Sequence, residues 1–408
     1  MSEAAHIPQL RFPEYSANWS QRLLSDFLIP TLREIEKPKV NYLAIGLRSH
    51  CKGTFQKPDS DPSKIAMEKL FRVKENDLIV NITFAWEGAI AIVKENDEGG
   101  LVSHRFPTYT FDTNITSHHF FKHQFINKRF RYLLDLISPG GAGRNRVMSK
   151  KEFVKLKVPL PSVGEQQKIA AFLTAVDNKI EQLSKKQALL GSWKKGLMQQ
   201  IFSQAIRFKA DDGSAFPVWE EKNIVELAKT SIGLVTSMTP YYVDKGVPLI
   251  RNNDIFQNKI RKEKLIRLDY EFDQLNKNRR LFTNDIVTVH TGNIGASAVI
   301  DEELNGCQGF ATLNTRIKNQ NEISSSFLCW YYNSTRNIKY ALSMATGDGR
   351  SNYNLKDFNK ATIPVPSLPE QTKIAAFLTA VDNKIEQVGK QLDESKQFKK
   401  ALLQQMFV

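Results

Sequence analysis

Four side chains near the middle of this 408-residue sequence imitate a catalytic arrangement. They follow the D…ExK pattern, in which carboxylates hold a divalent metal ion for phosphodiester cleavage, and they are Asp211, Asp212, Glu220 and Lys222. All four lie in a charged linker beside Trp219. We interpret their spacing as coincidental for that reason.

The pair His119 and His123 has the four-residue spacing of two metal ligands on one helical face. No acidic ligand accompanies the pair, and Phe120, Phe121 and Phe125 surround it. We therefore expect packed or surface histidines and no metal site.

Other motifs of catalysis are missing from the sequence. Neither an NPPY-type methyltransferase motif nor a G-x-x-x-x-G-K-[ST] phosphate loop occurs, and TGNIG at 291–295 is too sparse for a dinucleotide loop. The three cysteines, Cys51, Cys307 and Cys329, have no CxxC spacing and predict reduced, partly buried thiols. The chain is predicted to be non-catalytic by itself and to bind no cofactor.

The charge balance indicates the kind of partner. The chain has 57 Lys and Arg residues against 43 Asp and Glu, a net charge of +14 at pH 7, which favours a polyanion or an acidic membrane face. No 18-residue apolar run could span a bilayer, and the first residues, MSEAAHIPQL, lack the basic-then-apolar order of a signal peptide. We expect a cytoplasmic protein.

The stretch KIAAFLTAVDNKIEQ occurs twice without a change, at 168–182 and at 373–387. At the same offset of 205 residues, 27 of the 44 pairs between 159–202 and 364–407 are identical. Each copy starts with S-x-x-E, Ser162 with Glu165 and Ser367 with Glu370, which predicts a capping box at the start of a helix.

Apolar residues in both copies recur at alternating steps of three and four, as in a heptad seam. The seam is interrupted at Gln187 and Lys194 in the first copy and at Ser395 and Lys399 in the second. Each predicted helix of roughly 38 residues would be about 57 Å long. Since neither helix can stand alone in water, we expect the two to pair antiparallel about a pseudo-twofold axis. The seam residues are Ile169, Leu173, Val176, Ile180, Leu183, Leu190, Leu197 and Ile201, and then Ile374, Leu378, Val381, Ile385, Val388, Leu392, Leu402 and Met406.

The segments outside the helices repeat more faintly. Each begins at a tryptophan, Trp19 or Trp219, and continues with a predicted hairpin, 77–93 or 285–300. An aromatic-rich helical stretch and a glycine loop carrying arginine follow in both. These patterns predict a mixed α/β fold with an internal repeat. Its segments are a globular domain at 1–158, a helix at 159–207, a similar domain at 208–363 and a second helix at 364–408.

Residues off the heptad seam are also identical in the two helices. A second contact surface, presented twice to two copies of one partner, would keep them so. A recent duplication followed by recombination of the helices is the alternative, and both can hold. The residues predicted to bind the partner are Thr174, Asp177, Asn178 and Lys179, with Thr379, Asp382, Asn383 and Lys384.

The layout of Trp-led domain, PLPSVGEQQKIAAFLTAVDNKIEQ helix, second domain and PVPSLPEQTKIAAFLTAVDNKIEQ helix resembles the specificity subunit of Type I restriction-modification enzymes along essentially the whole chain. The resemblance implies two target recognition domains that each read half of a split, asymmetric sequence in double-stranded DNA. It also implies paired helices that set the spacer and dock two modification subunits. Those partners would supply S-adenosylmethionine and adenine methylation, and a restriction subunit would supply Mg- and ATP-dependent cleavage.

Polar loop residues are the predicted DNA contacts, because arginine suits guanine, and asparagine suits adenine, in the major groove. Solvated loop residues and phosphate contacts are the alternatives, and the basic runs at 259–267 and 277–280 could also contact phosphate. The predicted residues are Arg48, Ser49, His50, Lys52, Arg144, Asn145 and Arg146 in the first domain, and Arg251, Asn252, Asn253, Arg350, Ser351, Asn352 and Tyr353 in the second.

A protein of another class remains an alternative. A stand-alone DNA-binding regulator or architectural protein with a coiled-coil spacer would explain the charge and the two domains. It would not explain the identical outward faces of the helices.

Overall fold

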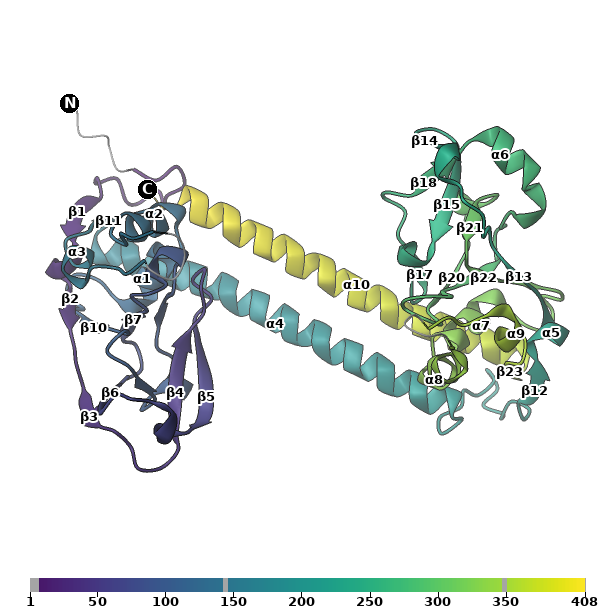
Figure 1. Cartoon of the computed structure of the whole chain (residues 1–408), viewed down its shortest axis with the longest axis horizontal. Coiled ribbons are helices and arrows are strands. Elements are labelled where there is room, and N and C mark those ends of the chain that lie inside the picture. Colours follow the sequence, from purple (N-terminus) through teal and green to yellow (C-terminus); the bar gives the residue numbers. More distant parts are fainter. Residues whose placement is uncertain (1–6, 142–145, 347–350, 408) are drawn as a thin grey trace. The chain divides into compact units, whose positions relative to one another are not determined.

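The computed structural model describes residues 7–141, 146–346 and 351–407. Its contacts divide the chain into two units, one formed by Met1–Ser184 with Lys390–Val408 and the other by Lys185–Gly389. Two long helices, α4 (Val163–Phe202) and α10 (Leu368–Gln405), each contribute one part to both units (Figure 1). Each unit therefore contains one globular domain and parts of both helices.

The first domain is built on a five-stranded sheet of order β3-β6-β9-β4-β5, a four-stranded sheet of order β2-β10-β7-β8 and the pair β1-β11. Among the described residues, its shorter α-helices are α1 (His118–Gln124), α2 (Lys128–Leu136) and α3 (Lys150–Phe153). The strands are β1 (Ser20–Leu23), β2 (Leu28–Pro30), β3 (Glu34–Glu36), β4 (Tyr42–Leu47), β5 (Thr54–Ser60), β6 (Lys69–Arg72), β7 (Leu78–Val80), β8 (Ile90–Ile92), β9 (Leu101–Val102), β10 (Thr108–Phe111) and β11 (Lys157–Leu160).

The second domain has two four-stranded sheets, β13-β22-β19-β20 and β14-β18-β15-β21, and the pairs β12-β23 and β16-β17. Its shorter helices are α5 (Ile224–Leu227), α6 (Tyr270–Leu275), α7 (Ser325–Tyr332), α8 (Thr335–Met344) and α9 (Leu355–Phe358). The strands are β12 (Glu220–Asn223), β13 (Ala228–Ile232), β14 (Tyr242–Val243), β15 (Val247–Arg251), β16 (Ile255–Phe256), β17 (Lys259–Ile260), β18 (Ile266–Leu268), β19 (Ile286–Thr288), β20 (Ser297–Val299), β21 (Gln308–Phe310), β22 (Leu313–Ile317) and β23 (Thr362–Val365).

Both predicted hairpins are present, as antiparallel β7-β8 and β19-β20, so the two domains share a central element and the mixed α/β prediction is confirmed. The aromatic-rich stretch that follows was expected to be helical, and in each domain it forms two helices, α1 and α2 or α7 and α8. Asn127 starts α2 and Ser334 starts α8, because each side chain accepts a bond from a backbone N–H of the helix that it precedes.

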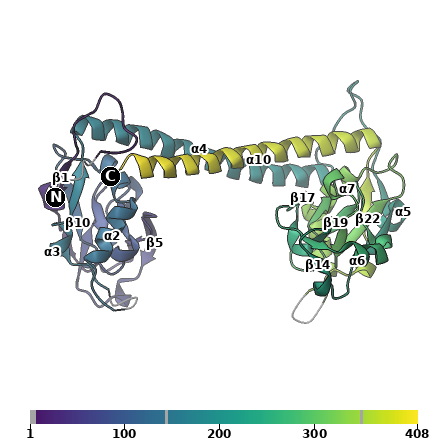
Figure 2. The ribbon, with the colours of Figure 1, turned by 90° about the horizontal axis from the view of Figure 1, so that it is seen from above.

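The long helices pack antiparallel inside each unit, where Figures 1 and 2 both show them side by side. In the first unit, Ile169 and Leu173 near the start of α4 share one buried core with Leu402 and Met406 near the end of α10. In the second unit, α10 contributes its start and α4 its end, including Ile374 and Ile201. The predicted antiparallel pairing is confirmed.

The segment that precedes the first strand of each domain, 7–19 or 203–219, is called the arm here. A buried glutamate at the start of each long helix binds this arm. Glu165 receives two bonds of 2.7 Å from the Arg11 guanidinium and one of 3.3 Å from the Trp19 indole N–H. Glu370 receives the same set in the second unit, from Arg207 at 3.1 and 2.6 Å and from Trp219 at 3.0 Å.

These bonds differ from the predicted capping boxes. Ser162 does accept the Glu165 N–H at 3.4 Å, whereas the Ser367 hydroxyl is buried without a partner among the described residues. Both carboxylates bond an arginine and a tryptophan because an ion pair with arginine compensates their complete burial better than one backbone N–H would.

The glutamine after each of these glutamates ties the long helix to the domain. Gln166 donates to the Ile115 carbonyl and accepts from the Thr116 hydroxyl, just before α1. Gln371 donates to the Glu322 carbonyl and accepts from the Ser324 N–H, just before α7. The Glu-Gln dipeptide thus connects the arm, the long helix and the domain.

Among the described residues, no helix is long and apolar enough to cross a membrane.

Candidate nucleic-acid interface

Three loops meet in each domain. Two of them carry the predicted DNA contacts, and they follow β4 and α2 in the first domain and β15 and α8 in the second. The third is the connection inside the central hairpin, residues 81–89 in the first unit and 289–296 in the second. Sequence reasoning identified the hairpins but missed these connections. The signal was one glycine at the same place in each, Gly88 and Gly295, where φ is 78° and 83°.

In the first unit, the β4-β5 loop turns at His50 and Cys51, whose φ angles of 61° and 54° are left-handed. Their N–H groups donate to the carbonyls of Glu87 and Gly88 at 2.8 Å each, and the Ser49 hydroxyl donates to the Glu87 carboxylate at 2.5 Å. A Cβ on Gly88 would lie 3.2 Å from the Cys51 sulfur. The close approach of these loops therefore depends on glycine.

The exposed side chains of this loop are Arg48, His50 and Lys52. Arg48 donates to the Thr54 carbonyl at 2.8 Å, and its guanidinium lies 5.3 Å from the centre of the Phe55 ring. The loop therefore presents cationic side chains from a backbone that hydrogen bonds hold in place.

Arg146 comes from the predicted glycine loop and has a structural role. It makes an ion pair with Asp135 at 2.7 Å, donates to the Ser138 carbonyl at 3.1 Å and lies 5.0 Å from the centre of the Trp86 ring. These contacts leave Arg146 poorly placed for a base contact. Arg144 and Asn145 lie outside the described residues.

In the second unit, hydrogen bonds join all three loops. The His290 N–H donates to the Asn252 side chain at 3.0 Å, and the Thr291 hydroxyl donates to the Asn352 side chain at 2.6 Å. The Tyr353 N–H donates to the His290 carbonyl at 3.0 Å. The structure thus brings together segments that are 100 residues apart in the sequence.

Several predicted contacts in the second unit are structural. Arg251 pairs with the buried Asp254 at 3.0 Å, Asn252 also donates to the Ala311 carbonyl, and Tyr353 is buried in the core. Asn253 and Ser351 are exposed. Arg350 lies outside the described residues.

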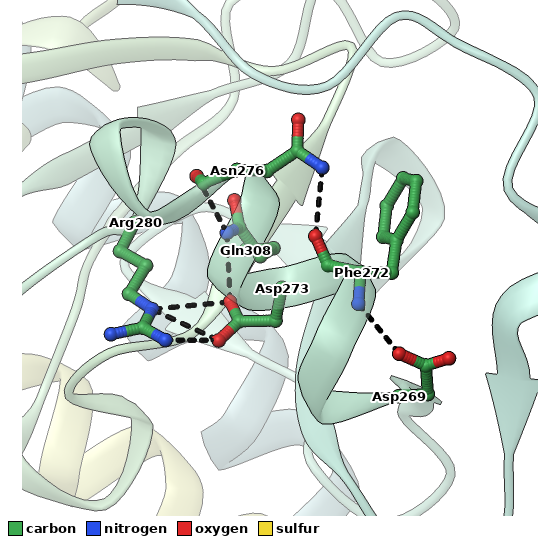
Figure 3. A network of polar contacts seen from close by, with 6 residues as sticks. All are labelled: Asp269, Phe272, Asp273, Asn276, Arg280 and Gln308. Atoms are coloured by element: carbon green, nitrogen blue, oxygen red, sulfur yellow. Dashed lines mark hydrogen bonds and ion pairs between the residues drawn. The ribbon is translucent and has the colours of Figure 1, made fainter.

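Several cations of the basic runs in the second unit pair with carboxylates. Arg280 binds Asp273, which also accepts from Gln308 at 2.9 Å and is fully buried (Figure 3). In the other run, Lys259 pairs with Glu386 at 2.7 Å and Lys262 with Asp301 at 2.5 Å. These cations hold segments of the unit together, which weakens the hypothesis that they contact phosphate.

Burial decides the chemistry of the thiols and of one histidine. It raises the pKa of Cys51 to about 11 and that of Cys307 to about 12, so neither is an activated thiolate. Burial also lowers the pKa of His290.

Among the described residues, no group of three or more His, Cys, Asp and Glu side chains is arranged to hold a metal ion.

The eight predicted partner-binding residues fall into two sets. Asn178, Lys179, Asn383 and Lys384 are exposed. Within their own units, Thr174 accepts from Lys122 at 3.2 Å, Thr379 accepts from Trp330 at 3.2 Å, Asp177 pairs with Lys399 at 2.5 Å and Asp382 pairs with Lys194. Contacts inside the chain therefore give another reason why these threonines and aspartates are the same in both repeats.

Both helix faces border hollows. In the first unit, Thr174 and Asn178 line a groove of about 390 Å³ with Ser117 and His119 of the domain. In the second unit, Thr379, Asp382 and Asn383 line a cleft of about 1010 Å³. Each hollow lies between a domain and a long helix.

The family model for the Type I restriction modification DNA specificity domain matches residues 28–190 and again 218–395. The two matches cover most of the sequence, one in each half of the repeat, so the chain belongs to this family.

Individual relatives agree with this assignment. A putative Type I restriction enzyme specificity subunit, MjaX of Methanocaldococcus jannaschii, is 26% identical over 275 residues, which cover 63% of this chain and 59% of the relative. The match thus spans about three fifths of that protein's length.

Solved structures show the same fold at low identity. The S subunit of a Type I restriction-modification system from M. genitalium has a TM-score of 0.58 and 15% identity, covering 98% of this chain and 99% of its own. The HsdS subunit from Thermoanaerobacter tengcongensis has a TM-score of 0.51 and 16% identity, covering 95% and 96%. The fold shared with these structures thus covers nearly the whole chain.

Proposed function

We propose that this protein is the DNA-binding specificity subunit of a Type I restriction-modification complex and that its two domains read the two halves of a bipartite, asymmetric DNA sequence. One observation carries the proposal: each unit brings three loops together on the same framework, and the loops have different residues in the two units. Two domains that share a framework but carry different loop side chains are suited to binding two different half-sites.

The exposed loop side chains are the best candidates for base contacts within this proposal. They are Arg48, His50 and Lys52 in the first domain, and Asn253 and Ser351 in the second. Hydrogen bonds fix the backbone that carries them, which lowers the entropy lost on binding. The net charge of +14 supports attraction to DNA phosphates.

The proposal includes two copies of a modification subunit, docked on the repeated helices near Asn178, Lys179, Asn383 and Lys384. Methylation with S-adenosylmethionine would take place in those partners, and ATP- and Mg-dependent cleavage in restriction subunits bound through them. The chain itself would be a non-catalytic, cytoplasmic component.

Methylome sequencing of the host with and without this gene tests the proposal. We expect methylation to disappear at one bipartite motif and to persist elsewhere. An unchanged methylome in a host whose modification subunit is active would refute the proposed role.

Co-purification distinguishes the alternative, a stand-alone DNA-binding regulator. A specificity subunit should be recovered with modification subunits from cells that encode them. A regulator should be recovered without them and still bind DNA.

A further inference from the structure

The two long helices expose one aromatic ring each at the same position of the repeat. Trp193 of α4 is 50% exposed and Phe398 of α10 is 52% exposed. The two residues are 205 positions apart, which is the offset of the repeated stretch, and they belong to different units.

This aromatic character persists where the two helices have diverged. None of the eight pairs between 186–193 and 391–398 is identical, yet the last pair is Trp and Phe. Another exposed apolar residue of the stretch, Leu189, corresponds to Glu394 and was not kept. A half-exposed ring gains less from burial within its own fold than a core ring does, so the fold alone explains this pair poorly.

The phenylalanines near Trp193 have counterparts in the first unit. The Trp193 ring meets Phe377 edge-on, with centroids 6.3 Å apart, and Phe377 meets Phe208 of the arm at 5.6 Å. In the first unit, Phe172 is the counterpart of Phe377, and it meets Phe12 of the arm at 5.9 Å. The phenylalanine pair that lies beside Trp193 is therefore repeated in the first unit.

The helix leaves these rings uncovered. The residue three positions later, which lies on the same face, is Gly196 in α4 and Ala401 in α10. A Cβ placed on Gly196 would contact nothing within 4 Å. The small side chain leaves room beside the ring for a partner to approach.

We propose that Trp193 and Phe398 are the anchors with which each unit docks one copy of the modification subunit, and this inference rests on the proposed function. Because both units present one half-exposed ring at the same position of the repeat, a single kind of apolar recess fits both, and one partner binds twice. Aromatic anchors in such recesses commonly dominate the affinity of protein interfaces.

Native mass spectrometry of the full chain with the modification subunit from the same host tests the inference. The wild type should carry two subunits, and Trp193→Ala and Phe398→Ala should each carry one at concentrations that saturate the wild type. The double variant should carry almost none, since each site should weaken about a hundredfold or more. Trp193→Phe should retain two subunits, because the other helix already uses phenylalanine.

Leu275→Ala is the control, an exposed apolar residue of α6 outside the two long helices, and should retain two subunits. Circular dichroism and binding of the free variants to DNA exclude misfolding as the cause of a loss. If the double variant still carries two subunits with unchanged affinity, the inference fails while the proposed function stands.

Two further outcomes would also contradict the inference. If the wild type recruits no modification subunit, the proposed function and this inference fail together. If the free wild type dimerises and the double variant is monomeric with unchanged recruitment, the rings join two copies of this chain, and the inference is wrong.

Discussion

The Nζ atom of Lys399 lies 2.5 Å from the Asp177 carboxylate and so joins α10 to α4 inside the first unit. Lys194 and Asp382 make the same ion pair in the second unit with the helices exchanged. Each repeated aspartate thus meets the lysine that follows the exposed aromatic position of the other helix. The two pairs fix the register of the helices, which explains part of the identity between the repeats.

Reversing the charge of Asp177 should destabilise the first unit. Asp177→Lys removes the ion pair and places two ammonium groups together, at a cost of about 1 kcal/mol for such a partly exposed pair. Adding Lys399→Asp should restore most of the loss. Urea unfolding, followed by hydrogen exchange in α4 and α10, measures both variants. The exposed pair Asp393–Lys396, at 4.0 Å, is the control, and its reversal should change little.

Glu370→Gln should loosen the arm of the second unit. The change removes the negative charge that compensates Arg207, and a partly buried guanidinium without its partner should cost about 2–3 kcal/mol. The Trp219 N–H bond can persist, so fluorescence of Trp219 reports local loosening beside the melting curve. Glu386→Gln, at an exposed ion pair, is the matched control. Equal effects of both substitutions would contradict the role of Glu370.

Acid should destabilise the first unit through His123. Burial, with the nearby cations Lys122 and Lys399 and the neighbouring His119, lowers the pKa of this ring from 6.5 to about 3, and neither nitrogen has a hydrogen-bond partner among the described residues. The unfolded chain therefore binds the extra proton first. Stability should fall as the pH drops from about 6.5 toward 3, by on the order of 1 kcal/mol per pH unit.

Replacing the ring tests this pH dependence. His123→Phe should flatten the decline of the first unit's stability in acid, measured by urea midpoints at several pH values. His104→Gln, at an exposed position, is the control and should leave the decline as it is. A slope that both variants share with the wild type would rule out His123 as the cause.

Neighbouring asparagines in the second unit should behave differently. Asn252 bridges two loops, so Asn252→Ala should reduce stability and weaken binding to every DNA sequence. Asn253 is exposed, and Asn253→Ala should change the preference at one half-site by about 1–3 kcal/mol without a change in melting temperature. Competition binding with DNA altered in one half at a time measures this preference. Equal weakening on all sequences would make Asn253 a phosphate contact.

Periodicity predicted the long helices, their pairing and the central hairpins, because each element shows its pattern locally. The division of the aromatic stretch at Asn127 was missed, since helix caps compete with a continuing apolar pattern. The roles of Glu165 and Glu370 were misassigned for a related reason. The S-x-x-E spacing is local, whereas the arginine and tryptophan that bind each carboxylate come from a distant arm.

The candidate interface was predictable as a set of loops but not residue by residue. Composition identifies Arg251 and Asn253 as equally suitable for DNA contact, yet Asp254 engages the first and leaves the second exposed. That difference depends on a carboxylate three residues away and on the backbone between them. Only the folded geometry separates side chains that support the loops from those that face outward.

The core of the first domain contains Phe407, whose ring lies 6.2 Å from that of Trp19 and 5.7 Å from that of Phe120. During translation, this phenylalanine leaves the ribosome after the whole second domain. The first domain made is therefore not the first one finished, because its hydrophobic centre stays open until residues 390–407 are synthesised. The first domain thus depends on Phe407, which follows the end of α10, to complete its core.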